Sequence, residues 1–410
     1  MTSLAYAALW IFIFAVPAES LIHLPGLSII TRATGIMAVG LTPLAIVISG
    51  RVRRWSTFHV AALLFVIWVG VGVWIFRGTG IPQKFYTFVQ LFVVLWMIWE
   101  LAPSAGRLRG LLTAYVLGAC VPALETLLLY HREAGNLRRF SAEEADPNSL
   151  AMTLALALPM AWYLGMTSRR PLLRGVFRGY LPLGLLTAAL TGSRGGMLAC
   201  MVALLIIPLT MTLSPGRLTT AIALLGLSGA LAVAYVPDTI VQRFATTATE
   251  VEDASFGGRF KLWVAGVHVF TARPLVGHGV GSFKQAITPE LGARAQVAHN
   301  SFLSVLVEEG LVGLLFYLVM FLSVFFSVLH LPRIERRFGL VLLATLGTAM
   351  LPLTWEDQKD VWVILAVLIG MSALQVSRPS GAVRQPTPRR AAPMGSPSVA
   401  ARSMDRDAPA

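Results

Sequence analysis

Three residues between positions 194 and 299 have side chains suited to chemistry on a phosphate-bearing substrate. Arg194 stands in the turn TGSRGG, Arg259 begins RFKLW, and His299 begins HNSF. A guanidinium group stays charged at any working pH and can form two parallel hydrogen bonds to phosphate oxygens. A neutral imidazole can accept a proton near pH 7. These residue types therefore predict an anion-binding site with a general base beside it.

Each of the three residues also has an ordinary structural interpretation. A short turn at a membrane surface often contains an arginine such as Arg194, whose long side chain reaches the headgroups. Arg259 is equally typical of the solvated end of an interfacial helix, and an isolated His299 is typical of a polar helix start. The sequence leaves these interpretations open, because it does not show that the three residues meet in space.

The residues after Arg259 are predicted to form an amphipathic helix that ends before Pro274. Lys261 and His268 lie off its apolar face, so the helix is expected to lie on the bilayer or on a helix bundle. Its first N–H groups and its dipole would favour an anion next to Arg259. The apolar face consists of Phe260, Trp263, Val264, Val267 and Phe270.

Neighbouring motifs give weaker indications. The glycine-rich GHGVGSF (277–283) offers backbone N–H groups that could hold a phosphate, although it lacks the lysine and hydroxyl residue of a P-loop. Asp146 begins DPN directly before an apolar run, which is typical of ordinary helix capping. His268 and His278 have no carboxylate at metal-ligand spacing, so we predict no metal site.

The elements that position these residues belong to a membrane protein. The mean hydropathy is +0.72, 56% of the residues are hydrophobic and only 13% are charged, values outside the range of soluble proteins. A spanning helix needs about 20 mostly apolar residues, and about twelve segments meet that requirement. We therefore predict an all-α polytopic membrane protein. The segments centre near Ile11, Met37, Phe65, Val93, Val116, Leu158, Leu186, Leu204, Leu227, Tyr317, Leu343 and Leu365.

Charge asymmetry between the loops predicts the orientation of these helices. If the N-terminus lies inside, the short inner loops contain thirteen basic residues against Glu335 alone, whereas the short outer loops contain eight basic and eight acidic residues. This excess follows the positive-inside rule, so both termini are predicted to lie inside. Nine spans are expected in 1–236, an outer loop with the amphipathic helix in 237–299, three spans in 300–376 and a disordered inner tail in 377–410.

The net charge of +13 has a topological explanation, because most of the basic residues face anionic headgroups. Nucleic-acid binding is therefore not predicted. Cys120 and Cys200 lie in apolar segments and are interpreted as packing residues. Of the carboxylates in apolar segments, Glu308 and Glu309 are expected near the outer interface and Glu125 at depth, with no role assigned to any of them.

The motifs together resemble the O-antigen ligase and polymerase superfamily of bacterial inner-membrane glycan transferases. The similar positions are Arg139-Phe140 followed by DPNSLA (146–151), then TGSRGG, GGRFKLWVAGVHVFTARPLVGHGVGSF and HNSFLSVLVEEGLVGLLFYL. They extend over residues 135–375, and their order and spacing are more specific than any single motif. Ala142 departs from the pattern, in which many members have glycine.

The resemblance implies a glycosyltransferase of lipopolysaccharide biosynthesis in the inner membrane, with both termini cytoplasmic and the active site facing the periplasm. An O-antigen ligase transfers a glycan from undecaprenyl pyrophosphate to a sugar hydroxyl of lipid A–core. By this resemblance His299 is the general base, while Arg194 and Arg259 bind the pyrophosphate and stabilise its charge as it leaves. Arg139 is a third donor-binding residue. Arginines in this role would replace a metal ion, so no metal or cofactor is expected. Displacement in one step predicts inversion at the anomeric carbon.

Two other activities in the superfamily would need the same donor site. A polymerase transfers the glycan to another lipid-linked repeat, and a protein O-oligosaccharyltransferase transfers it to serine or threonine. We favour the ligase because the outer loop is one compact excursion of about sixty residues. A transporter of lipid-linked oligosaccharides, from a different class, would need a charged central cavity, and the apolar segments contain no lysine or arginine at depth.

Overall fold

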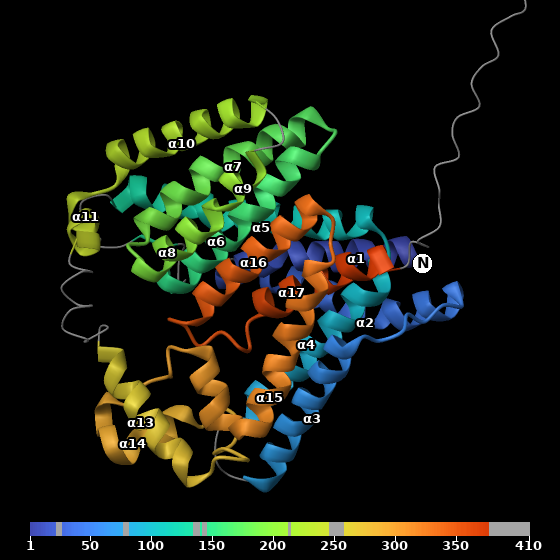
Figure 1. The fold of residues 1–410 in the computed structure, drawn as a ribbon, viewed down its shortest axis with the longest axis vertical. Coiled ribbons are helices and arrows are strands. Elements are labelled where there is room, and N and C mark those ends of the chain that lie inside the picture. Colours follow the sequence, from blue (N-terminus) through green and yellow to red (C-terminus); the bar gives the residue numbers. More distant parts are fainter. Residues whose placement is uncertain are drawn as a thin grey trace, which may run out of the picture.

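The computed structural model describes residues 1–21, 27–76, 82–133, 140–141, 146–211, 215–245 and 258–376. Within these ranges all regular secondary structure is helical (Figure 1). The first helices are α1 (Thr2–Ala15), η1 (Val16–Leu21), α2 (Leu27–Ser49), α3 (Thr57–Ile75), α4 (Pro82–Leu101) and α5 (Ala105–Glu133). The middle helices are α6 (Pro147–Thr167), α7 (Pro171–Leu190), α8 (Arg194–Leu204), α9 (Ile206–Met211), α10 (Pro215–Tyr235) and α11 (Asp238–Ala245). The last are α13 (Arg259–Ala272), α14 (Phe283–Leu291), η3 (Gly292–Arg294), α15 (Ser301–Leu329), α16 (Arg333–Met350) and α17 (Lys359–Val376).

Eight of the described helices are long and apolar enough to cross a membrane, and a shorter apolar stretch extends over Arg194–Thr210. The structure therefore confirms a polytopic helical membrane protein, and all twelve predicted centres lie in helices. Four predicted spans, centred near Leu186, Leu204, Leu343 and Leu365, lie in helices outside these eight, and two of them show why. The stretch after Arg194 is divided at Leu205 into α8 and α9, and α16 begins with four charged residues between positions 333 and 337. The predicted tail, 377–410, lies outside the described residues.

Helix α6 forms the centre of the bundle. It contains no charged residue, its side chains are nearly all buried, and it contacts α5, α7, α8 and α16. By contrast, α10 lies along α7 at the edge of the bundle, with most of its side chains exposed (Figure 1). The predicted cap of α6 is confirmed, because the Asp146 carboxylate accepts hydrogen bonds from the N–H groups of Asn148 and Ser149, both at 2.8 Å. Asp146 is therefore held at one end of the central helix.

Helices α13 and α14 pack on each other and against α15, below the main bundle in the view of Figure 1. The helix predicted after Arg259 is present as α13, and its predicted apolar face is divided: Trp263 and Phe270 pack inside the protein, whereas the other three residues are exposed. The buried residues are Leu262, Ala265 and Gly266. The residues of the predicted face that are about half exposed are Phe260, Val264 and Val267. The reason is close packing: a Cβ on Gly266 would lie only 3.0 Å from the ring of Phe283, so the small residues face α14 and the larger ones face outward.

Helix α15 is broken at Gly310, whose φ of 67° and ψ of −170° are not helical. The backbone groups freed by this break are paired with residues 274–279. The N–H of His278 donates to the Val307 carbonyl at 3.0 Å, and the N–H of Leu311 donates to the Pro274 carbonyl at 2.8 Å. Because a break inside a membrane helix is tolerated only where its polar groups are satisfied, this pairing stabilises the kink.

Replacing Gly310 with alanine is expected to destabilise the protein much more than replacing Gly292. Both glycines have positive φ, which costs an alanine about 1–3 kcal/mol. At Gly310 the new Cβ would also lie 2.3 Å from the Leu275 carbonyl oxygen, whereas Gly292 has open space. Thermal unfolding of the two purified variants in detergent measures the difference. Equal melting temperatures would contradict the role given to the 274–279 pairing.

Candidate active site

His299 is held by its backbone on both sides. Its N–H donates to Thr354 Oγ1 at 3.0 Å, and the preceding Ala298 carbonyl accepts from Trp263 Nε1 of α13, also at 3.0 Å. The following residue, Asn300, caps α15 by accepting from the N–H of Leu303. His299 itself has a φ of 46° and is the only non-glycine residue with positive φ among those the structure describes. Strained backbone of this kind persists where surrounding contacts impose it, and it concentrates at functional sites.

The charged groups that act on His299 come from segments that are distant in the sequence. Burial and the nearby charge of Arg259 lower the pKa of His299 below its ordinary value, while the carboxylate of Asp146 acts in the opposite direction. Burial likewise lowers the pKa of Arg259, and Asp146 again opposes this change. Asp146, Arg259 and His299 therefore lie close enough to change one another's ionisation, and the combined effect on His299 favours its neutral form.

Arg194 begins α8, directly after the residue that caps this helix. Ser193 Oγ accepts a hydrogen bond from the N–H of Gly196 at 3.2 Å. A Cβ on Gly195 would lie 2.9 Å from Met152 of α6 and 3.1 Å from Pro352. The glycines of TGSRGG thus allow the start of α8 to approach both α6 and the segment that contacts His299.

That segment, residues 351–358 between α16 and α17, connects the motifs. Besides the bond from His299 to Thr354, Trp355 Nε1 donates to Ser149 Oγ at 3.3 Å and the Trp355 N–H donates to Ser301 Oγ at 2.8 Å. From the sequence, these residues were predicted only to belong to an outer loop with balanced charge. One sequence feature could have marked this segment as functional: an aromatic residue and two adjacent acids, Trp355-Glu356-Asp357, stand between two apolar helices.

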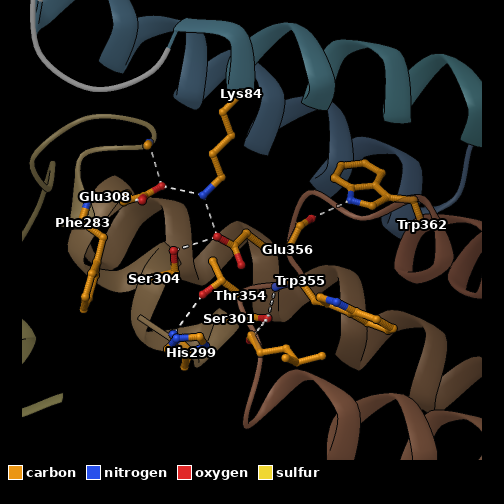
Figure 2. A network of polar contacts seen from close by, with 12 residues as sticks. Lys84, Phe283, His299, Ser301, Ser304, Glu308, Thr354, Trp355, Glu356 and Trp362 are labelled. Atoms are coloured by element: carbon orange, nitrogen blue, oxygen red, sulfur yellow. Dashed lines mark hydrogen bonds and ion pairs between the residues drawn. The ribbon is translucent and has the colours of Figure 1, made fainter. Parts of the chain in front are cut away.

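A buried group of charges, which we call the Lys84 cluster (Lys84, Ser304, Glu308 and Glu356), supports the 351–358 segment (Figure 2). Lys84 Nζ of α4 lies 2.8 Å from Glu308 Oε2 and 2.6 Å from Glu356 Oε1. Ser304 also donates to Glu356, at 2.7 Å. The side chains of Lys84, Glu308 and Glu356 are only 11%, 6% and 1% exposed. The cluster therefore joins α4, α15 and the segment that contacts His299.

This cluster adds to one sequence-based expectation and corrects another. Glu308 and Glu309 were expected near the outer interface with no role assigned; both side chains are buried inside the protein, and Glu308 is paired with Lys84. The glycine-rich motif GHGVGSF was considered as a phosphate cradle. Its Gly281 and Phe283 N–H groups instead donate to the Glu308 carboxylate, at 2.8 and 3.3 Å. The motif does hold an anion, but the anion is a side chain of the protein itself.

The remaining predicted residues are placed as follows. Arg139 lies outside the described residues, but the N–H of the adjacent Phe140 donates to the Leu190 carbonyl at 3.0 Å, directly before the TGSRGG turn. Glu125 is half-buried on α5. In the described part of the chain, His, Cys, Asp and Glu side chains form no group of three or more arranged to hold a metal ion.

Replacing Asp146 with asparagine is expected to move the acidic limb of the pH–rate profile to lower pH. His299 acts as a base only when neutral, so activity falls as the pH decreases through its pKa. Asp146 raises that pKa, and its neutralisation therefore lowers it further. Asparagine caps helices about as well as aspartate, so α6 should remain intact. Initial rates between pH 4 and pH 9 measure the shift, and a limb displaced to higher pH would contradict the assignment.

Comparison with protein families identifies part of the chain. The model of the family described as O-antigen ligase matches residues 179–318, a range that contains Arg194, Arg259 and His299. No protein in the curated comparison set matches the chain. Over residues 179–318 the match is consistent with the resemblance inferred from the motifs, because this range carries an O-antigen ligase family domain. The eight long apolar helices make the chain a multi-pass membrane protein.

Proposed function

We propose that the protein is an O-antigen ligase. It transfers a glycan from undecaprenyl pyrophosphate to a sugar hydroxyl of lipid A–core at the periplasmic face of the inner membrane. The observation that supports this proposal is the electrostatic interaction of His299 with Arg259 and Asp146, and both His299 and Arg259 lie inside the matched range. A base with lowered pKa beside a cation suits the deprotonation of a hydroxyl next to an anionic leaving group.

In the proposed reaction, the acceptor hydroxyl oxygen attacks the anomeric carbon of the donor sugar. The bond from this carbon to the pyrophosphate oxygen breaks, and the electron pair leaves with undecaprenyl pyrophosphate. The hydroxyl proton passes to His299. The guanidinium groups of Arg194 and Arg259 stabilise the negative charge that develops on the leaving group, with Arg139 as a third cation. The displacement occurs in one step and inverts the anomeric configuration, without a metal ion.

Positioning is the main task of such a site, since a pyrophosphate is already an activated leaving group. The contacts around His299 suit this task. Its backbone is hydrogen-bonded to Thr354, and the neighbouring carbonyl is hydrogen-bonded to Trp263 on the same helix as Arg259. Helix α13 therefore carries Arg259 and also, through Trp263, fixes the backbone next to His299.

The proposal is tested by incubating purified protein with lipid-linked glycan donor and lipid A–core in the presence of a chelator. Formation of glycosylated lipid A–core with inverted anomeric configuration, measured by mass spectrometry and NMR, is the expected result. Arg194→Lys and Arg259→Lys should each lower the rate about 10²-fold or more, because lysine does not reproduce the paired phosphate contacts. Arg294→Lys, at an exposed position, is the matched control. Donor-to-donor elongation would identify a polymerase instead, and retained configuration would exclude the one-step reaction.

A further inference from the structure

A cavity lies at the opposite end of the bundle from His299. Its volume is about 750 Å³, and its walls come from the residues before α3 and from the C-terminal ends of α4, α15 and α17. The Lys84 cluster lies at the N-terminal ends of α4 and α15. Lys84 and Trp99, at the two ends of α4, are about 22 Å apart along the helix at 1.5 Å per residue. The cavity and the candidate active site are therefore separated by most of the thickness of a membrane.

The lining of this cavity is cationic on one side and apolar on the other. Arg53, Arg54 and His330 supply the basic groups, and the lining contains no carboxylate. The apolar surface comes from Trp99, Ile369 and Ala373, and serine and glutamine side chains complete the wall. A cavity of this volume can hold an organic molecule and is much larger than a phosphate ion requires.

The contacts of Arg53 fix the position of its side chain but leave most of its guanidinium N–H groups without a hydrogen-bond acceptor among the described residues. Its guanidinium lies 3.7 Å from the centroid of the Trp99 ring, and one of its nitrogens donates to the Trp99 carbonyl at 2.5 Å. The Arg53 backbone N–H donates to the carboxylate of Glu100, at 3.3 Å, so the nearest acid is engaged by the backbone. Of the five N–H donors of this guanidinium, only one has an acceptor among the described residues. Such a prearranged arginine binds an anion with little loss of side-chain freedom.

We propose that this cavity binds an anionic phospholipid, with the lipid phosphate on Arg53 and Arg54 and the glycerol and first acyl carbons against Trp99, Ile369 and Ala373. The combination of cations and an apolar wall at the end of membrane helices matches a molecule that is charged at one end and apolar at the other. The loop that contains Arg53 and Arg54 is one of those predicted to lie inside, where anionic headgroups are available. The bound lipid would bridge α4, α15 and α17, the helices that also surround the Lys84 cluster.

Thermal unfolding of delipidated protein in detergent tests this site. Phosphatidylglycerol should raise the melting temperature in a saturable manner, because a ligand that binds only the folded state stabilises it, whereas phosphatidylcholine should not. Arg53→Gln/Arg54→Gln should weaken the apparent affinity about tenfold or more, since charge-assisted hydrogen bonds are lost. Arg54→Gln alone is the second variant, because Arg54 is exposed and has no hydrogen bond among the described residues.

Arg51→Gln is the matched control, since Arg51 lies in the same loop but does not line the cavity. It should bind phosphatidylglycerol like the wild type. Two results would overturn the proposal. One is equal stabilisation of wild type and the double variant by phosphatidylglycerol. The other is an equal rise in melting temperature with inorganic phosphate alone, which would indicate a site for free phosphate rather than for a lipid.

Discussion

Replacing His299 with asparagine is expected to lower the rate of glycan transfer about 10²–10⁴-fold, while donor binding and thermal stability stay close to those of the wild type. The loss follows from removal of the proposed base, since an amide does not accept the hydroxyl proton. Asparagine is chosen because it tolerates positive φ better than most residues, and His299 has a φ of 46°. His299→Ala would remove the base but would also cost the strain of that conformation.

Initial rates with lipid-linked donor and lipid A–core measure the effect, and the melting temperature shows whether the fold is preserved. Donor affinity, measured without acceptor, separates loss of the base from loss of the donor site. Transfer by His299→Asn within tenfold of the wild type would exclude His299 as the base. In that case the proposed catalysis would depend only on the stabilisation of the leaving-group charge by Arg194 and Arg259.

Replacing Lys84 with methionine is expected to destabilise the protein by about 3–5 kcal/mol, the usual effect of removing one partner of a buried ion pair. The carboxylates of Glu308 and Glu356 would remain buried without their cation. Lys359→Met is the matched control, because the Lys359–Glu19 pair is more exposed, at 22% and 38% of the two side chains. An exposed pair of this kind contributes about 0–1 kcal/mol.

A double variant separates the loss of charge from the loss of packing. Lys84→Met/Glu356→Gln should be more stable than Lys84→Met alone, because one of the two unpaired carboxylates becomes neutral. Urea or thermal unfolding in detergent gives the comparison, and transfer rates show whether the 351–358 segment still positions His299. Equal stability of Lys84→Met and Lys359→Met would show that the Lys84 cluster does not hold the fold together.

Local sequence signals were sufficient for several features of this protein. Apolar runs placed all twelve predicted centres in helices, since a membrane helix satisfies its backbone hydrogen bonds within one segment. The cap at Asp146 was equally recognisable, because capping depends on the residue type at a single position. The motifs around Arg194, Arg259 and His299 also indicated the family correctly.

Other features depended on contacts between distant segments. The direction of the buried face of α13 was decided by Phe283 of α14, which requires Gly266 rather than a larger side chain at the contact. The Lys84 cluster had no sequence signal, because Glu308 and Glu356 are 224 and 272 residues from Lys84 and no periodicity relates them. For the same reason the 351–358 segment was not recognised as the support of His299.

Residue types and apolar runs were thus enough to predict a helical membrane protein and to select the residues that could bind a phosphate or accept a proton. The packing of the helices was needed to show that Asp146, Arg259 and His299 act on one another and that the buried Lys84 supports the 351–358 segment next to His299. Helix formation and capping are satisfied within a few residues of chain, whereas a cluster of charges exists only after the helices have packed.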